Sequence, residues 1–170
     1  MVGGWAIDLF LGHQSRPHDD LEIAVLRPDF GAVRRALAAC ELFMVGDGEV
    51  RRLPTDAQPP LDKHQNWVLD VDAQAWRMDV MLEPGDADTW VFRRDPSVRP
   101  PRSFMIDRKE DGIPCLGAHG ALLYKAKAAR PKDEADFSAC LPHLAPEAQA
   151  WLAVALDQVH PGHPWRARLG

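Results

Sequence analysis

The spacing of apolar residues predicts a helix and then a strand near the start of the chain. Residues 5–11 are apolar except for Asp8, and Gly12 follows them. A short apolar run that ends in glycine is typical of a buried helix with a glycine stop. Residues 21–25 alternate apolar side chains with polar or small ones, which is the period of a strand that buries one face.

The middle of the chain predicts one more helix and a set of strands. Asp29, at the end of a turn, is placed to cap a helix over residues 30–41. Residues 46–48, with the sequence Gly-Asp-Gly, are a hairpin signal between two short strands. We expect strands at residues 42–45, 49–53, 67–71 and 75–82, and a shorter one at residues 90–93.

The last third of the chain changes to the helical period. Residues 95–112 are rich in Pro, Arg and Asp, and we expect an irregular segment there. Helices are expected at residues 118–129, 133–141 and 146–159. This order predicts an α+β fold, with a mixed β-sheet core and flanking helices over residues 1–112 and a small helical subdomain over residues 113–170.

Composition and charge narrow the class of protein. A chain of 170 residues can hold one domain, or a core with a small helical appendage. No stretch resembles a signal peptide, and no apolar run is long enough to cross a membrane. The three cysteines are widely separated and odd in number, which favours reduced thiols in a cytoplasmic protein over disulfides or a zinc site. The net charge of −5 argues against a nucleic-acid-binding protein. Four of the six tryptophans lie in apolar segments and are expected in the core: Trp5, Trp67, Trp76 and Trp90.

Two groups of residues near the start of the chain suggest anion and metal binding. Gly3 and Gly4 stand just before the first expected helix, where glycines let a phosphate approach the backbone and the helix start favours an anion. An ordinary glycine turn before a core helix is the alternative. Asp20 and Glu22 project from one face of the expected strand, and two such close carboxylates repel each other unless a cation such as Mg²⁺ lies between them. An acid pair alone is weak evidence, because the chain has others.

The order and spacing of these groups form a family signature. The stretch GGWAIDLFLG followed by R-x-H-D-D-L-E resembles the nucleotidyltransferase superfamily that includes DNA polymerase β, in which a glycine pair opens a helix and a D-x-[D/E] pair follows on the next strand. Within it, the stretch most resembles the aminoglycoside 2''-adenylyltransferases and the lincosamide nucleotidyltransferases. The match is close over about the first 26 residues and looser beyond. It combines, in one order, Gly3, Gly4, Trp5, Asp8, Gly12, Arg16, His18 and the two acids.

The resemblance implies a third carboxylate on a later strand beside the first two. Asp79 is the best match, because it lies deep in an apolar run. The residues on either side of it, Met78 and Val80, would face the core, whereas Asp79 would lie on the other face of the strand. Asp70 and Asp72 are the rivals, on the preceding expected strand. The alternative interpretation of Asp79 is a structural ion pair, for example with Arg77 or Arg93.

A second segment resembles the superfamily at the start of the helical part. Residues 122–136 are similar to a K…R-x-K-D-x-x-D segment that follows the core in several bacterial nucleotidyltransferases, where a lysine reaches the triphosphate. Lys125 and Lys127 are two residues apart and cannot share one face of a helix, and we favour Lys125 for this role. Solvated lysines on an amphipathic helix are the alternative, and Asp133 could act simply as a helix cap.

The resemblance implies a reaction and a set of roles. The reaction is Mg²⁺-dependent transfer of a nucleoside monophosphate, AMP in the first instance, from ATP or another nucleoside triphosphate to a hydroxyl of a small aminoglycoside-like or lincosamide-like acceptor. Asp20 and Glu22 would hold Mg²⁺, and Asp79 would complete a second metal site or accept the proton of the attacking hydroxyl. The residues implied to contact the phosphates are Gly3, Gly4, Arg16, His18 and Lys125, with Arg93 and Arg94 as weaker candidates. Arg16 is the strongest side-chain candidate, because its guanidinium matches phosphate oxygens.

The sequence also departs from the family pattern. Only Met1 and Val2 precede the glycine pair, whereas members of the family normally place a helix and an apolar strand before it. We therefore expect either a start further upstream or a sheet that lacks one edge strand. Glu22 also replaces the commoner second aspartate. Two other hypotheses stay open: a weakly active or non-catalytic binding or regulatory protein of this fold, and a toxin-type nucleotidyltransferase that acts on tRNA or on a protein.

Overall fold

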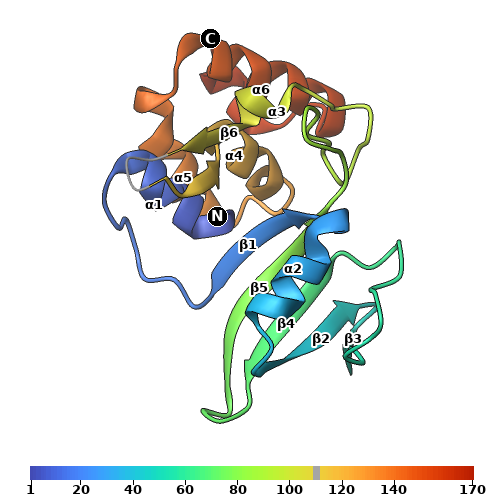
Figure 1. Cartoon of the computed structure of the whole chain (residues 1–170). Coiled ribbons are helices and arrows are strands. Elements are labelled where there is room, and N and C mark those ends of the chain that lie inside the picture. The colour runs from blue at the N-terminus through green and yellow to red at the C-terminus, as the bar shows by residue number, and fades with distance from the viewer. Residues whose placement is uncertain (109–111) are drawn as a thin grey trace. The chain divides into compact units, whose positions relative to one another are not determined.

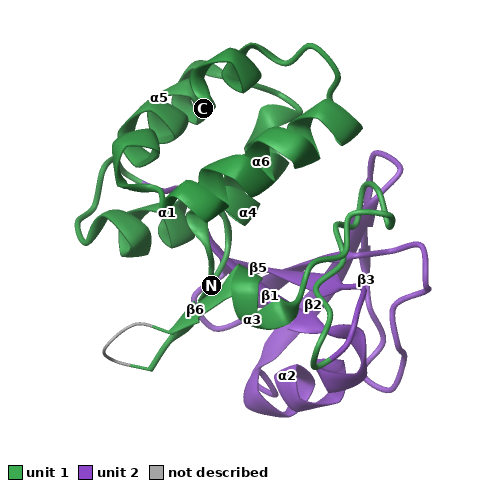
Figure 2. Ribbon diagram, turned by 90° about the horizontal axis from the view of Figure 1, so that it is seen from above, with its two compact units in different colours: residues 1–17, 87–170 green, residues 18–86 purple. Residues whose placement is uncertain are grey.

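The structure, a computed structural model, describes residues 1–108 and 112–170. The strands of a mixed sheet lie between residues 21 and 83, and three successive helices lie between residues 118 and 159, which confirms the predicted α+β class. The chain divides into two compact units, shown in Figure 2: unit 1 comprises Met1–Pro17 and Ala87–Gly170, and unit 2 comprises His18–Asp86. The boundaries of these units differ from the predicted division at residue 112, because the first helix belongs to the same unit as the C-terminal helices. A functional division at that residue stays a prediction.

Unit 2 is built on a mixed five-stranded sheet with the order β1-β5-β4-β2-β3 (Figure 1). The strands are β1 (Leu21–Leu26), β2 (Cys40–Gly46), β3 (Glu49–Arg52), β4 (Gln65–Asp70) and β5 (Ala75–Glu83). β1 runs parallel to β5, and the remaining neighbours are antiparallel. The expected hairpin is confirmed, since Asp47 and Gly48 both take positive φ values, 54° and 76°, in the turn between β2 and β3. The predicted strands at residues 67–71 and 75–82 are also confirmed.

One helix, α2 (Phe30–Ala36), covers one face of this sheet (Figure 1). Phe30 packs there with Val68, Val80 and Leu82 in a buried core. The prediction of a helix as far as residue 41 was wrong, because Cys40 already pairs with β4 as the first residue of β2. Pairing within a sheet overrides a helical pattern of this length.

The predicted cap of α2 was also wrong. Asp29 lies in the 3₁₀ turn η1 (Arg27–Asp29), and its side chain makes no capping hydrogen bond. Among the tryptophans, Trp90 is completely buried as expected and Trp67 is half-buried, but Trp76 is 51% exposed. The expectation of a core position was therefore wrong for Trp76.

Unit 1 is mainly helical. Its longer helices are α1 (Gly3–Leu11), α4 (Ala118–Ala126), α5 (Pro131–Cys140) and α6 (Pro146–Val159), which confirms the four helices predicted in these regions. α1 packs against α4 and α5, and α4 packs against α6. Their inward side chains form one core, which includes Ile7, Trp90, Leu122, Phe137 and Leu152. Short 3₁₀ turns, η2 (Leu141–His143) and η3 (Pro164–Arg168), complete the C-terminal part.

The connection between the sheet and the helices is more regular than predicted. It contains α3 (Arg102–Met105) and β6 (Ile106–Arg108), and β6 pairs with β7 (Pro114–Leu116). The irregular segment predicted over residues 95–112 was therefore partly wrong, and its residues 109–111 lie outside the described residues. The short strand predicted at residues 90–93 was wrong as well, since residues 91–93 lie outside any strand and the nearby pairing of Thr89 with Pro101 is an isolated bridge.

Two further expectations concern the cysteines and the membrane. Cys40, Cys115 and Cys140 are all thiols, and the last two are buried. Within the residues that the structure describes, no helix has the length and apolar character that a membrane crossing requires.

Candidate active site

The sheet of unit 2 brings together the three carboxylates that the sequence singled out. Glu22 on β1 lies directly opposite Asp79 on the parallel neighbour β5. Asp20 stands immediately before β1, two residues from Glu22. Residues paired across neighbouring strands point to the same face and lie about 5 Å apart. Glu22 and Asp79 are therefore adjacent side chains on the sheet face opposite α2, with Asp20 close by.

Asp79 has the most perturbed ionisation of the three. The pKa of its carboxyl is raised to about 6, mainly by burial and also by the negative charges of Glu22 and Asp20. Hydrogen bonding from Gln65 and Trp67 opposes this rise. The Gln65 amide donates to Asp79 Oδ2. The other oxygen, Asp79 Oδ1, is buried and has no hydrogen-bond partner among the described residues. A buried acceptor left in this state costs free energy unless a ligand or metal engages it.

The donor set of these residues fits Mg²⁺. Three carboxylates offer the hard, anionic oxygens that this ion prefers, and the unpartnered Oδ1 of Asp79 supplies an acceptor already inside the protein. With their side chains as described, however, no three or more His, Cys, Asp or Glu residues of the described chain are arranged to hold a metal ion. The carboxylates match the ion in chemistry and charge, but they do not form a closed cage.

One of the rival acids, Asp70, has a structural role. Arg77 Nε and Nη2 donate to Asp70 Oδ2 at 3.0 and 2.9 Å, and the Ala73 N–H donates to Asp70 Oδ1 at 3.0 Å. These hydrogen bonds close the turn between β4 and β5 and lower the pKa of Asp70. Arg77 is therefore the partner of Asp70, which argues against the alternative interpretation that pairs it with Asp79.

The glycine pair lies in unit 1 and opens α1. Gly3 takes a φ of 65°, a conformation that residues with a Cβ rarely adopt, and Gly4 is buried. At the other end, Gly12 is left-handed with a φ of 78°, and its N–H donates to the Asp8 carbonyl. The predicted glycine stop is confirmed. The buried Asp8 side chain accepts hydrogen bonds from the N–H and the hydroxyl of Ser15, so it fixes the segment that follows α1.

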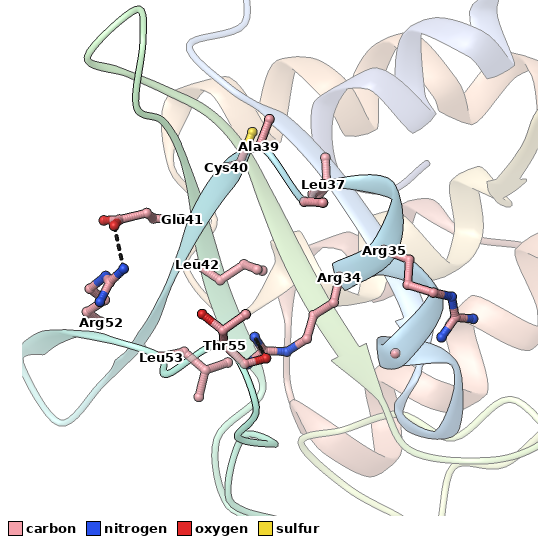
Figure 3. Close-up of a pocket in the computed structure, with 12 residues that line it drawn as sticks. Arg34, Arg35, Leu37, Ala39, Cys40, Glu41, Leu42, Arg52, Leu53 and Thr55 are labelled. Carbon is pink, nitrogen blue, oxygen red and sulfur yellow. Dashed lines mark hydrogen bonds and ion pairs between the residues drawn. The ribbon is translucent and has the colours of Figure 1, made fainter.

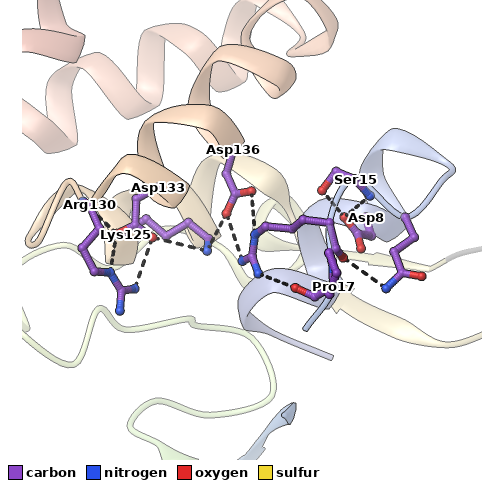
Figure 4. Close-up of polar contacts among 9 residues, drawn as sticks. Asp8, Ser15, Pro17, Lys125, Arg130, Asp133 and Asp136 are labelled. Carbon is purple, nitrogen blue, oxygen red and sulfur yellow. Dashed lines mark hydrogen bonds and ion pairs between the residues drawn. The ribbon is translucent and has the colours of Figure 1, made fainter. Parts of the chain in front are cut away.

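Arg16 and Lys125, two of the implied phosphate contacts, meet at one acid in unit 1 (Figure 4). Lys125 Nζ lies 2.8 Å from Asp136 and 3.7 Å from Asp133, and Arg16 Nε lies 3.4 Å from the other oxygen of Asp136. The Lys125 side chain is only 10% exposed, whereas Lys127 is exposed, so the two lysines do occupy different faces of the helix.

Sequence reasoning missed the role of Asp136. Asp133 caps α5 as expected, since its carboxylate accepts a hydrogen bond of 3.0 Å from the Arg130 N–H. Asp136 lies one turn further on, is 3% exposed, and holds both cations. One feature of the sequence could have indicated this role. Asp136 is three residues after Asp133, so the two are neighbours on a helix that also buries Phe137 and Cys140.

The remaining candidates are less informative. His18 is half-buried at the start of unit 2, and its role stays a prediction. Arg94 is engaged within unit 1, where its guanidinium donates to the Tyr124 carbonyl at 2.6 Å and lies over the Tyr124 ring. Burial lowers the pKa of Arg94.

Unit 2 also has a separate hollow of about 570 Å³ beside α2, β2 and β3 (Figure 3). Arg34 donates there to the carbonyls of Pro54, Thr55 and Ala57, and Arg52 pairs with Glu41. The described residues that line it include none of the three carboxylates. The hollow is therefore distinct from the candidate active site.

The two units differ in charge. The sequence of unit 2 contains 14 acidic and 7 basic residues, a net charge of −7. The sequence of unit 1 contains 11 acidic and 13 basic residues, a net charge of +2. The overall value of −5 therefore conceals a strongly acidic unit around the carboxylates and a weakly basic unit around the glycine pair, Arg16 and Lys125.

Comparison with known proteins identifies relatives of this architecture. The family model described as aminoglycoside-2''-adenylyltransferase matches residues 1–140. Two solved structures are similar: a solution structure of the antibiotic-resistance factor ANT(2'')-Ia, and a crystal structure of ANT(2'')-Ia in complex with adenylyl-2''-tobramycin. Each is 16% identical with a TM-score of 0.56 and covers 92% of this chain, with 80% and 86% of the respective relatives covered. At this identity the likeness shows the fold alone. No curated protein matches the chain.

Proposed function

Because the chain belongs to the aminoglycoside-2''-adenylyltransferase family and is therefore a nucleotidyltransferase, we propose that it transfers AMP from ATP to a hydroxyl of an aminoglycoside. The observation that carries this proposal is the pairing of Glu22 with Asp79 on neighbouring strands, beside Asp20. Three acids at this spacing repel each other, and this repulsion adds to the larger effect of burial in raising the pKa of Asp79. Such repulsion is tolerated where a cation is part of the working site.

The proposed roles divide the three acids by position. Asp20 and Glu22 would hold Mg²⁺, and Asp79 would share the metal or accept the proton of the attacking hydroxyl. A carboxyl with a pKa of about 6 is ionised at neutral pH, yet it is a better proton acceptor than an ordinary aspartate. Bound Mg²⁺ would supply neutralisation of the negative charge on the phosphate oxygens.

The chemical step is an in-line displacement at the α-phosphorus of ATP. The acceptor O–H bond breaks as its oxygen forms a bond to phosphorus, and the proton passes to a carboxylate such as Asp79. The bond between phosphorus and the bridging oxygen breaks, and pyrophosphate leaves. Positioning and charge stabilisation account for most of the catalysis in such transfers.

The phosphate contacts are proposed from unit 1. The N–H groups at the start of α1, next to Gly3 and Gly4, have no partner within the helix and suit an anion. Arg16 and Lys125 are held side by side on Asp136, which supports a role for this cation pair in binding phosphate oxygens. His18 remains a further candidate contact.

The charges of the protein support the proposed acceptor and compartment. Aminoglycosides are polycations, and a unit with a net charge of −7 attracts them and concentrates them near its acids. The three thiols favour a reducing compartment, and we propose the cytoplasm.

A transfer assay tests the proposal directly. ATP labelled at the α-phosphate is incubated with the protein, MgCl₂ and tobramycin, kanamycin or lincomycin, and labelled acceptor is separated from ATP. We expect transfer to an aminoglycoside that requires Mg²⁺ and is lost in Asp20→Asn and Asp79→Asn. Asp70→Asn is the matched control, because this acid occupies the neighbouring strand without belonging to the proposed site. Transfer that survives in Asp20→Asn would overturn the assignment of the site.

A further inference from the structure

Three aromatic side chains gather beside Asp79 on the sheet of unit 2. The rings of Phe43 and Trp76 lie 5.2 Å apart and those of Trp67 and Trp76 lie 5.5 Å apart, both in edge-to-face contact. Phe43 and Trp67 are half-buried, and Trp76 is 51% exposed. Together these three residues, here called the aromatic platform, offer a partly solvated apolar surface next to the candidate active site.

Strand register places the platform on the same face as the carboxylates. Glu22 lies opposite Asp79, Asp79 opposite Trp67, and Trp67 opposite Phe43, which forms one row across four strands. Side chains that are directly opposite share one face of a sheet. The other face packs on α2, so this row lies on the face that α2 leaves uncovered. Trp67 also donates a hydrogen bond to Asp79, so the platform contacts the site itself.

A bulge adds Trp76 to this face. Asp79 and Trp76 are three residues apart on β5, and strict alternation would turn Trp76 towards the core. The register between β4 and β5 shifts, however, so that Val68 opposes Met78 and Leu69 opposes Trp76. Arg77 is thus the extra residue, and the bulge turns Trp76 towards Trp67. The exposed tryptophan is therefore directed to the face of the site by the backbone.

We propose that the aromatic platform binds the amino-sugar rings of the acceptor, an inference that rests on the proposed function of the carboxylate site. Amino sugars combine apolar C–H ring faces, which pack on aromatic rings, with ammonium groups, which are attracted to the faces of tryptophan. The net charge of −7 on this unit favours a cationic occupant over the base of an anionic nucleotide. The platform would hold one ring of the acceptor while its reactive hydroxyl lies near Asp79.

Substitution of Trp76 tests this subsite, because half of its surface is exposed and its loss should leave the fold intact. The probe is tobramycin, with initial rates measured while tobramycin and ATP are varied in turn. We expect Trp76→Ala to raise the KM for tobramycin about five- to tenfold and to leave the KM for ATP unchanged. Trp76→Phe should recover most of the loss. Leu61→Ala is the matched control, since Leu61 is an 81% exposed apolar residue of the same unit outside the aromatic contacts.

Direct binding separates failure of the subsite from failure of the proposed function. Calorimetric titration of tobramycin into the wild type and Trp76→Ala, without nucleotide, should show weaker binding by the same factor. If the wild type binds tobramycin, loses that binding in Trp76→Ala and transfers nothing, the proposed function falls and the subsite stands. If tobramycin is adenylylated and its KM is the same in Trp76→Ala, the subsite is overturned and the function stands. A rise in the KM for ATP alone would make the platform a nucleobase surface and would also overturn the proposal.

Discussion

The carboxylate of Asp79 is buried and also faces two other acids, and both conditions oppose its ionisation. The pKa of this group rises from 3.8 to about 6, which means that the folded state binds the proton more tightly than the unfolded state. The contribution to stability therefore has a definite sign. Below about pH 4 the group is protonated in both states and costs nothing, and the metal-free protein loses stability as the pH rises from 3.8 to about 6.

Asp79→Asn removes this cost. We expect the variant to unfold at higher urea concentration than the metal-free wild type at neutral pH. The gain in the free energy of unfolding should be about 3 kcal/mol, because the rise in the pKa of Asp79 from 3.8 to about 6 corresponds to that energy. The gain should vanish below about pH 4, where both proteins carry a neutral group. Transfer activity should be lost in the same variant. Equal or lower stability than the wild type at neutral pH would contradict the burial of a charged Asp79.

Only part of the environment of Asp79 could be predicted from the sequence. Alternation of apolar and polar positions predicted that Asp79 faces away from the core, and the structure agrees. The pairing of Asp79 with Glu22 depends on the parallel register of two strands that are about 50 residues apart, which no local pattern specifies. The family resemblance implied a third carboxylate, and the apolar run around Asp79 favoured this residue over Asp70.

Whole elements were predictable where a local pattern and a turn signal agreed. The hairpin around Asp47 and Gly48, the strands β4 and β5, and the helix α6 all have such signals. The end of α2 and the bulge at Arg77 were not predicted, because each is decided by pairing with β4. The exposed position of Trp76 follows from that bulge and was missed for the same reason.

Asp136 joins three elements of unit 1, namely α4, α5 and the segment after α1, through its contacts with Lys125 and Arg16. Asp136→Asn would leave the nearly buried Lys125 with only the more distant carboxylate of Asp133, 3.7 Å away. We expect a loss of about 3 kcal/mol in the free energy of unfolding, because breaking a buried ion pair leaves an uncompensated charge. Urea unfolding of the single variants and of the double variant gives the coupling energy.

The matched partner in this cycle is Lys125→Met, which removes the opposite charge and keeps much of the apolar stem. The double variant Asp136→Asn/Lys125→Met should lose less than the sum of the single losses, since neither charge is then left alone. Simple additivity would show that the two residues do not interact in solution. Because Lys125 is also a proposed phosphate contact, the KM for ATP should rise in Lys125→Met.

At the scale of the whole molecule, charge is separated between the two units, −7 in unit 2 and +2 in unit 1. The overall charge of −5 disfavoured a nucleic-acid coat as an interpretation, and it concealed this separation. Only the structure reveals it, because unit 1 is assembled from both ends of the chain. In the sequence, the glycine pair and the acids lie in one continuous stretch that matches the family pattern. In the structure, the first segment of unit 1 ends at Pro17, so the glycine pair belongs to unit 1 and the acids belong to unit 2.

This separation predicts that changes in salt and in surface charge affect the KM values of the two proposed substrates differently. Raising NaCl from about 0.05 to about 0.3 M screens exposed charges, so the KM for tobramycin should increase severalfold. Replacing two exposed acids of unit 2, in Asp56→Lys/Asp72→Lys, should raise the KM for tobramycin at low salt and flatten its salt dependence, since neither acid belongs to the proposed site. The KM for ATP, measured in the same assays, should stay constant or fall in this variant. If both KM values change by the same factor, salt acts on the fold as a whole, and the acidic unit has no selective attraction for the cationic acceptor.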